Sequence, residues 1–188
     1  MPIINAGDGP GQHPTQALLD LYTIRKEVGR LDHLNVAFVG DLANGRTVRS
    51  LVYLLAKYRG TRFTFVAPDV VRIGDDIKEY LTRQEVHFEE VFELDPALAK
   101  ADVVYQTRVQ KERFADKPEE YARAKGKFII DRESLAKMKG DAVLMHPLPR
   151  VDEITPEVDA DPRAAYFRQA QNGLFVRMAV LKLVLLGS

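Results

Sequence analysis

Short apolar runs alternate with segments of helical spacing along most of this chain, and this alternation restricts the fold more than any other feature. The runs lie at residues 36–39, 63–66, 103–105 and 142–145, with a shorter candidate at 86–88. Between two of them, Val48, Leu51, Val52 and Leu55 recur at helical spacing. Strands that alternate with helices form βαβ units and a mostly parallel sheet flanked by helices. We therefore predict a doubly wound α/β fold, with all 188 residues in a single domain.

The segment His146-Pro147-Leu148-Pro149-Arg150 directly follows the last apolar run. Each proline lacks an N–H group and restricts the residue before it, so this segment can neither extend the sheet nor begin a helix. We expect an extended loop at the carboxyl end of a strand. In open α/β sheets, ligands bind at such strand ends.

Polar clusters follow two other predicted strands. The segment 40–47 contains Arg46, and the segment 107–110 contains Arg108. Two arginines beside the proline-rich loop favour a small ligand with two acidic groups, because each guanidinium can hold a carboxylate in a bidentate fork. For either arginine alone, a solvated side chain or a pair with a local acid is the better interpretation.

The glycines at 40 and 45 do not form a nucleotide-binding loop. The segment matches neither the dinucleotide fingerprint nor a Walker loop, so a generic nucleotide-binding Rossmann domain is a weak alternative. We interpret these glycines as turn residues that place Arg46. His13 precedes Pro14 at the expected start of a helix, where a positive helix terminus disfavours the imidazolium form. A neutral His13 could donate a hydrogen bond to a carbonyl oxygen, with Gln16 facing the same ligand.

Charge and composition restrict the remaining function classes. Basic and acidic residues number 27 each, which argues against a nucleic-acid partner. There is no cysteine, no His/Asp/Glu set has the spacing of metal ligands, and we predict neither a metal nor a cofactor. The most apolar stretch, 174–186, carries Arg177 and Lys182 and is too short to span a bilayer. Without a signal-like N-terminus, we expect a cytoplasmic protein that does not associate with membranes.

Two predicted helices, at about residues 14–28 and 164–186, carry apolar residues on several faces. In the first, Ala17, Leu21, Ile24 and Val28 form one stripe, whereas Leu18 and Tyr22 lie off it. One sheet covers only one side of a helix, so something else must cover the rest. Either the last helix is packed into its own core, or its free faces meet a second domain or another chain, which we favour.

Six segments resemble, in the same order, the aspartate carbamoyltransferase family, and more narrowly its aspartate-binding half. They are Asn5 to Gly9, Gln12 to Gln16, Gly45 to Val48, Arg108 to Arg113, His146 to Glu153, and Ala165 to Gly173. The related ornithine enzymes carry a cysteine where this chain has Pro147, and their Ser-Met-Gly signature does not occur here. The resemblance covers nearly the whole chain.

The resemblance implies transfer of a carbamoyl group from carbamoyl phosphate to L-aspartate, a step of pyrimidine synthesis. It further implies a homotrimer of catalytic chains for the full enzyme. By analogy, Arg46 binds the α-carboxylate of aspartate, and Arg108, oriented with Gln110, binds the β-carboxylate. For the carbamoyl group, the implied contacts are His13 to the carbonyl oxygen, Gln16 to the amide, and the backbone carbonyls of Leu148 and Pro149 to the nitrogen.

The family's carbamoyl phosphate-binding domain, with its Ser-Thr-Arg-Thr phosphate loop, does not occur in this sequence. We therefore expect one part of a longer enzyme, whose first and last helices here bridge to the other domain. The alternative from another class is a non-catalytic module that binds or senses an acidic amino acid.

Overall fold

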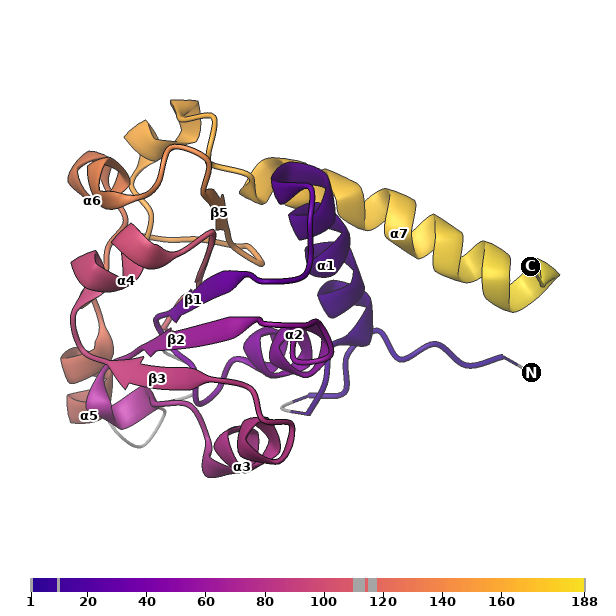
Figure 1. Ribbon diagram of the computed structural model, residues 1–188, viewed down its shortest axis with the longest axis horizontal. Coiled ribbons are helices and arrows are strands. Elements are labelled where there is room, and N and C mark those ends of the chain that lie inside the picture. The colour runs from indigo at the N-terminus through magenta and orange to yellow at the C-terminus, as the bar shows by residue number, and fades with distance from the viewer. Residues whose placement is uncertain (1, 10, 110–113, 115–117, 188) are drawn as a thin grey trace.

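The core of the protein is a five-stranded parallel sheet, seen here in a computed structural model that describes residues 2–9, 11–109, 114 and 118–187 (Figure 1). The strands are β1 (Asn35–Val39), β2 (Arg62–Val66), β3 (Phe88–Val91), β4 (Val103–Gln106) and β5 (Val143–Met145). Their order is β3-β2-β1-β4-β5, and every neighbouring pair is parallel. The predicted doubly wound fold is confirmed.

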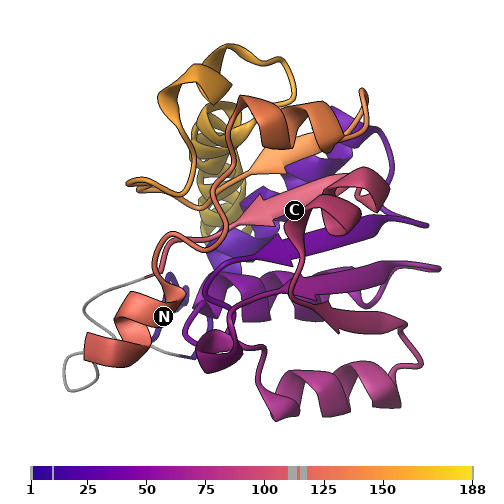
Figure 2. The same ribbon diagram turned by 90° about the vertical axis from the view of Figure 1, so that its left-hand side faces the viewer.

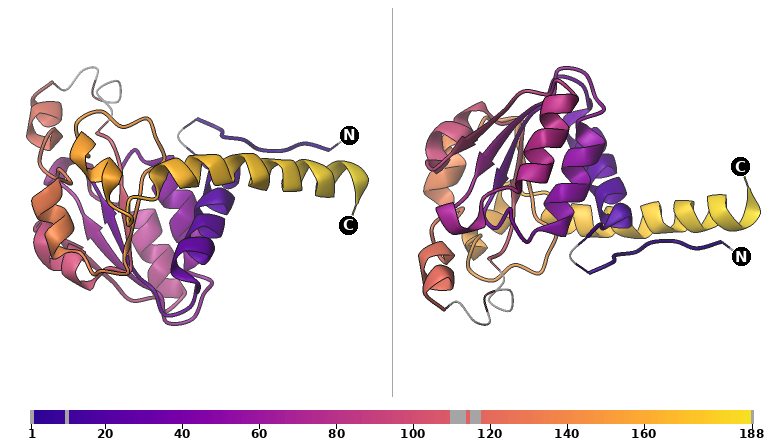
Figure 3. Two further views of the ribbon diagram at one scale, coloured as in Figure 1. Left: turned by 90° about the horizontal axis from the view of Figure 1, so that it is seen from above. Right: turned by 90° about the horizontal axis from the view of Figure 1, so that it is seen from below.

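Helices cover both faces of the sheet, as the views from above and below show (Figure 3). One face packs against α1 (Pro14–Val28), α2 (Arg46–Leu55) and α3 (Asp75–Arg83), and the other against α4 (Leu94–Lys100) and α6 (Arg132–Lys137). Successive residues of a strand point to opposite faces. Phe38 accordingly joins the first core, whereas Ala37 and Val39 join the second.

The part of the chain from residue 118 to α6 lies at the edge of the domain, on the carboxyl side of the strands (Figure 2). It contains the short helix α5 (Pro118–Ala124). Two short 3₁₀ helices, η1 (Asp69–Val71) and η3 (Pro156–Ala160), complete the described elements.

The one misplaced strand is β3. The apolar run suggested residues 86–88, but the strand begins at Phe88 and continues through Glu89 and Glu90 to Val91. β3 is the edge strand beside β2, and all four of its residues are only partly buried. An edge strand accepts charged residues on its open side, so its sequence lacks the apolar pattern that identifies a central strand.

The helix α1 is enclosed on more than one side, as expected. It packs on α2 and on α7 (Tyr166–Leu186), and Leu18 and Tyr22 lie on its exposed side. The buried set differs from the predicted stripe: Ala17 and Ile24 are buried, whereas Leu21 and Val28 are only partly buried. Polar residues take part of the buried surface instead, namely Thr15, Gln16, Asp20 and Thr23.

The helix α7 begins two residues later than expected and projects from the domain (Figures 1 and 3). Its first turns hold buried residues, including Gln169 and Asn172. Beyond Gly173, Leu174, Met178 and Leu185 are each at least 58% exposed. The expectation of apolar faces left uncovered by the domain is confirmed.

Candidate functional site

The strand order changes direction between β1 and β4, which run side by side at the centre of the sheet. At such a switch point the following loops diverge and leave a crevice. A pocket of about 270 Å³ opens there, at the carboxyl ends of β1, β4 and β5 and beside the first turn of α1. An adjoining cavity of about 220 Å³ shares Thr107 and Arg108 with it.

The pocket brings together every predicted site residue that the structure describes. These residues are His13, Gln16, Arg46, Arg108, Leu148 and Pro149. Gln110, predicted to orient Arg108, lies outside the described residues. Other lining residues lie in the segments predicted to follow the strands but were given no individual role, including Asp41, Asn44, Thr47, Thr107 and Pro147.

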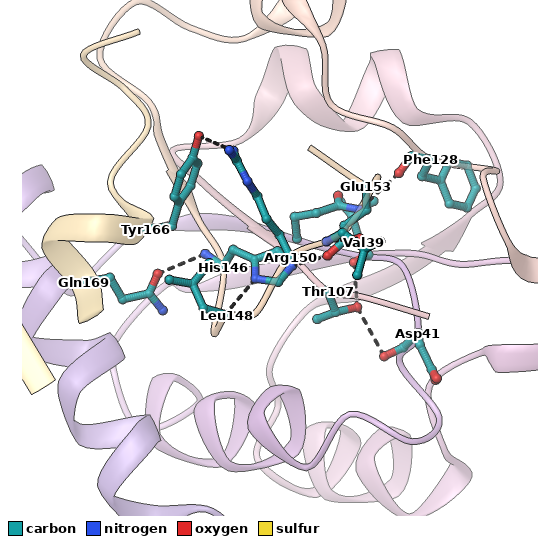
Figure 4. Close-up of polar contacts among 12 residues, drawn as sticks. Val39, Asp41, Thr107, Phe128, His146, Leu148, Arg150, Glu153, Tyr166 and Gln169 are labelled. Atoms are coloured by element: carbon teal, nitrogen blue, oxygen red, sulfur yellow. Dashed lines mark hydrogen bonds and ion pairs between the residues drawn. The ribbon is translucent and has the colours of Figure 1, made fainter. Parts of the chain in front are cut away.

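Gly40 and Thr107 place the two arginine-bearing segments. Gly40 has a φ of +110°, and a side chain there would meet the Thr107 carbonyl oxygen at 2.5 Å. Only glycine allows this approach. The Thr107 hydroxyl donates hydrogen bonds to the carbonyl oxygens of Val39 (2.9 Å) and Asp41 (3.3 Å) (Figure 4). The ends of β1 and β4 are thereby joined, and Arg108 follows directly at the pocket.

Arg46 is the first residue of α2, after a turn closed by Asp41, whose Oδ1 accepts the backbone N–H of Asn44 at 3.0 Å. Its guanidinium donates a hydrogen bond to the Gly9 carbonyl oxygen at 3.1 Å. Gly7 has a φ of +130°, and a side chain on it would reach within 2.9 Å of Arg46 Nη1. The N-terminal segment therefore passes close to this arginine at Gly7, which explains the glycine at that position.

His13 is the N-cap residue of α1, as predicted. Its backbone N–H donates to Ser50 Oγ at 2.8 Å, and that hydroxyl donates to Gln12 Oε1 at 2.6 Å. Burial lowers the pKa of His13, and the charges of Arg46 and Arg177 act in the same direction. The ring is therefore neutral at physiological pH. Its Nδ1 is buried without a hydrogen-bond partner among the described residues.

The buried His146 accepts and donates hydrogen bonds that fix the shape of the proline loop, which is defined as residues 146–150 (Figure 4). His146 Nδ1 accepts the backbone N–H of Leu148 at 2.8 Å, so the ring proton lies on Nε2, 2.7 Å from Glu153 Oε1. Burial raises the pKa of Glu153, but the hydrogen bond from His146 and those from the backbone together outweigh burial, and the net shift is downward. The backbone N–H of His146 donates to Gln169 Oε1 at 2.9 Å.

Arg150, at the end of the proline loop, belongs to the scaffold. Its Nη2 lies 2.6 Å from Asp159 Oδ2, and its Nη1 donates to the Tyr166 hydroxyl at 3.0 Å. The guanidinium also stands over the Tyr166 ring, 5.2 Å from its centroid. Arg150 therefore ties the loop to η3 and α7 and does not line the pocket (Figure 4).

A buried carboxylate lies behind the pocket wall. Asp20 is fully buried on α1 and accepts hydrogen bonds from Gln16 Nε2 (2.9 Å), Gln169 Nε2 (2.6 Å) and the Tyr105 hydroxyl (2.7 Å). Burial raises the pKa of Asp20 to about 7, although the three hydrogen bonds oppose this shift. No sequence pattern identified Asp20, because two of its three donors come from distant elements, Tyr105 from β4 and Gln169 from α7.

Two further observations restrict the chemistry of the described residues. No group of three or more His, Cys, Asp or Glu side chains is placed to hold a metal ion in the parts of the chain that the structure describes. None of the described helices combines the length and the apolarity that a membrane span requires.

Fold and pocket define an α/β domain with a pocket at the switch point of a parallel sheet, the place where ligands bind in folds of this kind. Residues 32–184 match the family model of the aspartate/ornithine carbamoyltransferase Asp/Orn binding domain, and residues 1–26 match that of the carbamoyl-P binding domain. The chain belongs to the aspartate/ornithine carbamoyltransferase family.

The relatives of high sequence identity include aspartate carbamoyltransferases from plants and bacteria. The chain is 62% identical to the chloroplastic aspartate carbamoyltransferase of Arabidopsis thaliana, over 100% of this chain and 48% of that protein. It is 53% identical to the aspartate carbamoyltransferase catalytic subunit of Aliivibrio fischeri, over 98% of this chain and 59% of that protein. It thus spans about half the length of these relatives.

Solved structures of similar fold also come from aspartate transcarbamoylases. The catalytic subunit of M. Jannaschii aspartate transcarbamoylase matches with a TM-score of 0.90 at 50% identity, over 98% of this chain and 59% of that chain. The Trypanosoma cruzi enzyme in complex with carbamoyl phosphate and aspartate matches with a TM-score of 0.92 at 44% identity, over 98% of this chain and 60% of that chain.

Proposed function

We propose that this chain is the aspartate-binding part of an aspartate carbamoyltransferase, which transfers the carbamoyl group of carbamoyl phosphate to the amine of L-aspartate. The observation that carries the proposal is the single pocket that gathers His13, Gln16, Arg46, Arg108 and the proline loop. The names of its relatives, and the aspartate and carbamoyl phosphate bound by the T. cruzi enzyme, support the same reaction.

Arg46 and Arg108 bind the two carboxylates of aspartate, Arg46 the α-carboxylate and Arg108 the β-carboxylate. Two guanidiniums in one pocket match a dicarboxylic amino acid in charge, and each fork can hold one carboxylate. An amine with a cationic side chain, such as ornithine, would bring its charge toward the same guanidiniums and bind poorly. Gln110 is proposed to orient Arg108.

The carbamoyl group binds between α1 and the proline loop. Neutral His13 donates a hydrogen bond from Nε2 to the carbonyl oxygen, where negative charge develops during attack. Gln16 and the backbone carbonyls of Leu148 and Pro149 accept the hydrogen bonds of the carbamoyl NH₂ group. The two prolines have no N–H, and that of Leu148 is bonded to His146. Residues 147–149 therefore offer only acceptors, as an NH₂ group requires.

The reaction itself is an addition followed by an elimination. The neutral amine of aspartate forms a bond to the carbamoyl carbon, and the bond from that carbon to the phosphate oxygen breaks. The phosphate leaves with the bonding electron pair and can take the proton that the amine loses. Positioning two reactants in one pocket and stabilising the oxyanion supply the rate enhancement.

The partner of this domain is a carbamoyl phosphate-binding domain, to which α1 and α7 form the bridge. The match of residues 1–26, which include most of α1, to the family's carbamoyl-P model supports this arrangement, as do the exposed apolar residues of α7. A homotrimer of catalytic chains and a cytoplasmic location remain predictions. The plant relatives are named chloroplastic, so the compartment differs between members of the family.

The test joins this chain to a carbamoyl phosphate-binding domain of the family and measures carbamoyl aspartate formation. We expect turnover with aspartate and none with ornithine. Arg46→Ala should remove most activity. Arg49→Ala serves as the matched control, because Arg49 lies one turn after Arg46 on α2, pairs with Asp76 of α3 and does not line the pocket. Equal activity with both amines, or no effect of Arg46→Ala, would contradict the proposal.

A further inference from the structure

Asp20 connects three elements behind the pocket: its own helix α1, strand β4 through Tyr105, and α7 through Gln169. Its Oδ1 accepts N–H groups from both Gln16 and Gln169, and its Oδ2 accepts the Tyr105 hydroxyl. A carboxylate that receives three donors and has no exposed surface sets the direction of each donor.

The two glutamines are oriented by this carboxylate because only the NH₂ side of an amide can face it. In Gln16, which lines the pocket, the carbonyl oxygen is thereby kept for other partners. In Gln169, the carbonyl oxygen accepts the backbone N–H of His146 at 2.9 Å. A reversed Gln169 amide would place its NH₂ group against that N–H. Asp20 therefore acts on the pocket wall directly through Gln16 and on the proline loop through Gln169.

The part of the pocket between Gln16 and the proline loop is therefore lined by hydrogen-bond acceptors on two sides. The proline loop presents carbonyl oxygens, since its prolines lack N–H groups and the N–H of Leu148 is held by His146. Gln16 adds its amide oxygen from α1. A ligand group that donates N–H bonds is favoured there, whereas a methyl group of similar size would leave these acceptors without partners.

We propose that Asp20 is a positioning residue that makes this end of the pocket an acceptor surface, and thereby selects an acyl phosphate whose reacting carbon carries NH₂ instead of CH₃. The inference rests on the proposed function and adds the residue that determines selectivity for the donor. Sites built to hydrogen-bond a substrate N–H or O–H reject the analogue that lacks it by factors of about 10⁴–10⁵. Carbamoyl phosphate and acetyl phosphate form the matched pair.

The kinetic test compares the two acyl phosphates in an enzyme that joins this chain to a carbamoyl phosphate-binding domain. Asp20→Leu removes the acceptor of both glutamines and should lower the ratio of kcat/KM for carbamoyl over acetyl phosphate by about tenfold or more. Asp20→Asn keeps an oxygen for the two amides and should retain most of this preference. Thr23→Val is the matched control, because it breaks another buried contact between α1 and α7, to Asn172, away from the pocket.

A double-substitution cycle separates this role from a general effect on folding. If Asp20 acts through Gln16, then Asp20→Leu should change the preference much less in a Gln16→Ala background than in the wild type. An equal change in both backgrounds, or an unchanged preference in the single variant, would overturn the inference. An equal change in Thr23→Val would also overturn it, because loosening α1 from α7 would then suffice.

A spectroscopic measurement on the 188-residue chain decides the inference even where Asp20→Leu does not fold or the joined enzyme has no activity. The side-chain amide ¹⁵N signals of Gln16 and Gln169 should move together with one midpoint as Asp20 titrates, and should not do so in Asp20→Asn. The other ionisable groups near Asp20 are Tyr105, Arg177 and His146. The pKa of Tyr105 is raised well above its ordinary value, so this group does not titrate near neutral pH, and of the two glutamines only Gln169 is hydrogen-bonded to His146. Independent behaviour of the two signals would refute the shared carboxylate. A joined enzyme without activity would count against the proposed function alone.

Discussion

The Asp20 carboxyl illustrates, at the scale of one residue, how burial and hydrogen bonding oppose each other. Burial disfavours the charged form, and the donors from Gln16, Gln169 and Tyr105 favour it. Burial prevails, and the pKa rises from 3.8 to about 7. Burial also raises the pKa of Tyr105, and the same carboxylate acts in the same direction.

This raised pKa predicts how Asp20 affects stability as a function of pH. The folded protein holds the Asp20 proton more tightly than the unfolded chain does. The contribution to the free energy of unfolding is therefore fully present below about pH 4 and is lost as the pH rises to about 7. At about 1.4 kcal/mol for each pH unit, the loss amounts to about 4 kcal/mol at most.

Urea unfolding of the wild type and of Asp20→Asn, between pH 4 and pH 8, measures this contribution. The difference in unfolding free energy between the two should shift in favour of the variant as the pH rises. The difference is the useful quantity, because carboxyls such as Glu153 and Asp102 have lowered pKa values and give the opposite slope in both proteins. A constant difference would show that Asp20 titrates near its ordinary pKa.

The two pocket arginines should differ in their response to substitution. In an enzyme with both domains, Arg108→Ala should raise the KM for aspartate more than Arg46→Lys does. Removal of a guanidinium leaves a carboxylate unpaired at a cost of about 2–5 kcal/mol, whereas lysine keeps the charge and loses only the fork. Arg123→Ala, at a surface pair with Asp69, is the control. Unchanged aspartate dependence in Arg108→Ala would exclude this residue from the site.

The sequence predicts residues of the site where a local rule places them. His13 precedes a helix-starting proline, Arg46 and Arg108 follow central strands, and the proline loop cannot continue its strand. The network of Asp20 and Gln169 follows no local rule, since the two residues are 149 positions apart and meet only when α1 packs on α7. Buried polar contacts between distant helices depend on the packed structure.

At the scale of elements, the predicted strands and helices agree with the structure where burial is complete. The central strands β1 and β4 are apolar on both faces and were located within one residue of each end. The edge strand β3 carries Glu89 and Glu90 and was misplaced. In α1, polar residues occupy part of the buried surface and conceal it from a search for apolar stripes. Partial burial weakens the pattern that prediction requires.

The exposed face of α7 predicts self-association of the isolated chain. Leu181 is 48% exposed and Leu185 is 66% exposed, on a helix that projects from the domain (Figure 3). Burying apolar surface is worth about 25 cal/mol per Å², and patches above a few hundred Å² mark interaction sites. Sedimentation should therefore show dimers or larger species, and the double substitution Leu181→Gln, Leu185→Gln should shift them toward monomer.

Phe92→Gln provides the control for this element, because Phe92 is 54% exposed and lies under the guanidinium of Arg72. It directly follows the edge strand β3, whereas α7 contacts α1 and β5, the strand at the opposite edge of the sheet. The substitution should leave the association unchanged. A wild-type chain that stays monomeric at high concentration, with α7 protected from hydrogen exchange, would show instead that the helix folds back onto its own domain.

At the scale of the whole molecule, the pocket is formed by the loops at one edge of the sheet and lies beside α1. The termini of α1 and α7 bring Gln16 and Gln169 to this edge, and the apolar length of α7 extends beyond it (Figure 1). The same two helices thus complete the pocket and offer the surface proposed to meet a carbamoyl phosphate-binding domain. The positions of Gln16 and Gln169, and the proposed attachment of that domain, therefore both depend on how α1 packs against α7.

The balance of charge in the pocket predicts that the 188-residue chain alone has no significant carbamoyltransferase activity. Its described lining residues supply two guanidiniums, which the two carboxylates of aspartate would occupy. No further lysine or arginine among these residues is left for the phosphate group. Removing even one preorganised donor can lower turnover by about 10²–10³-fold. Carbamoyl aspartate formation by the purified chain should therefore stay near background, and the addition of a carbamoyl phosphate-binding domain should restore it. Turnover by the chain alone at the level of the joined enzyme would show that these residues suffice for both substrates.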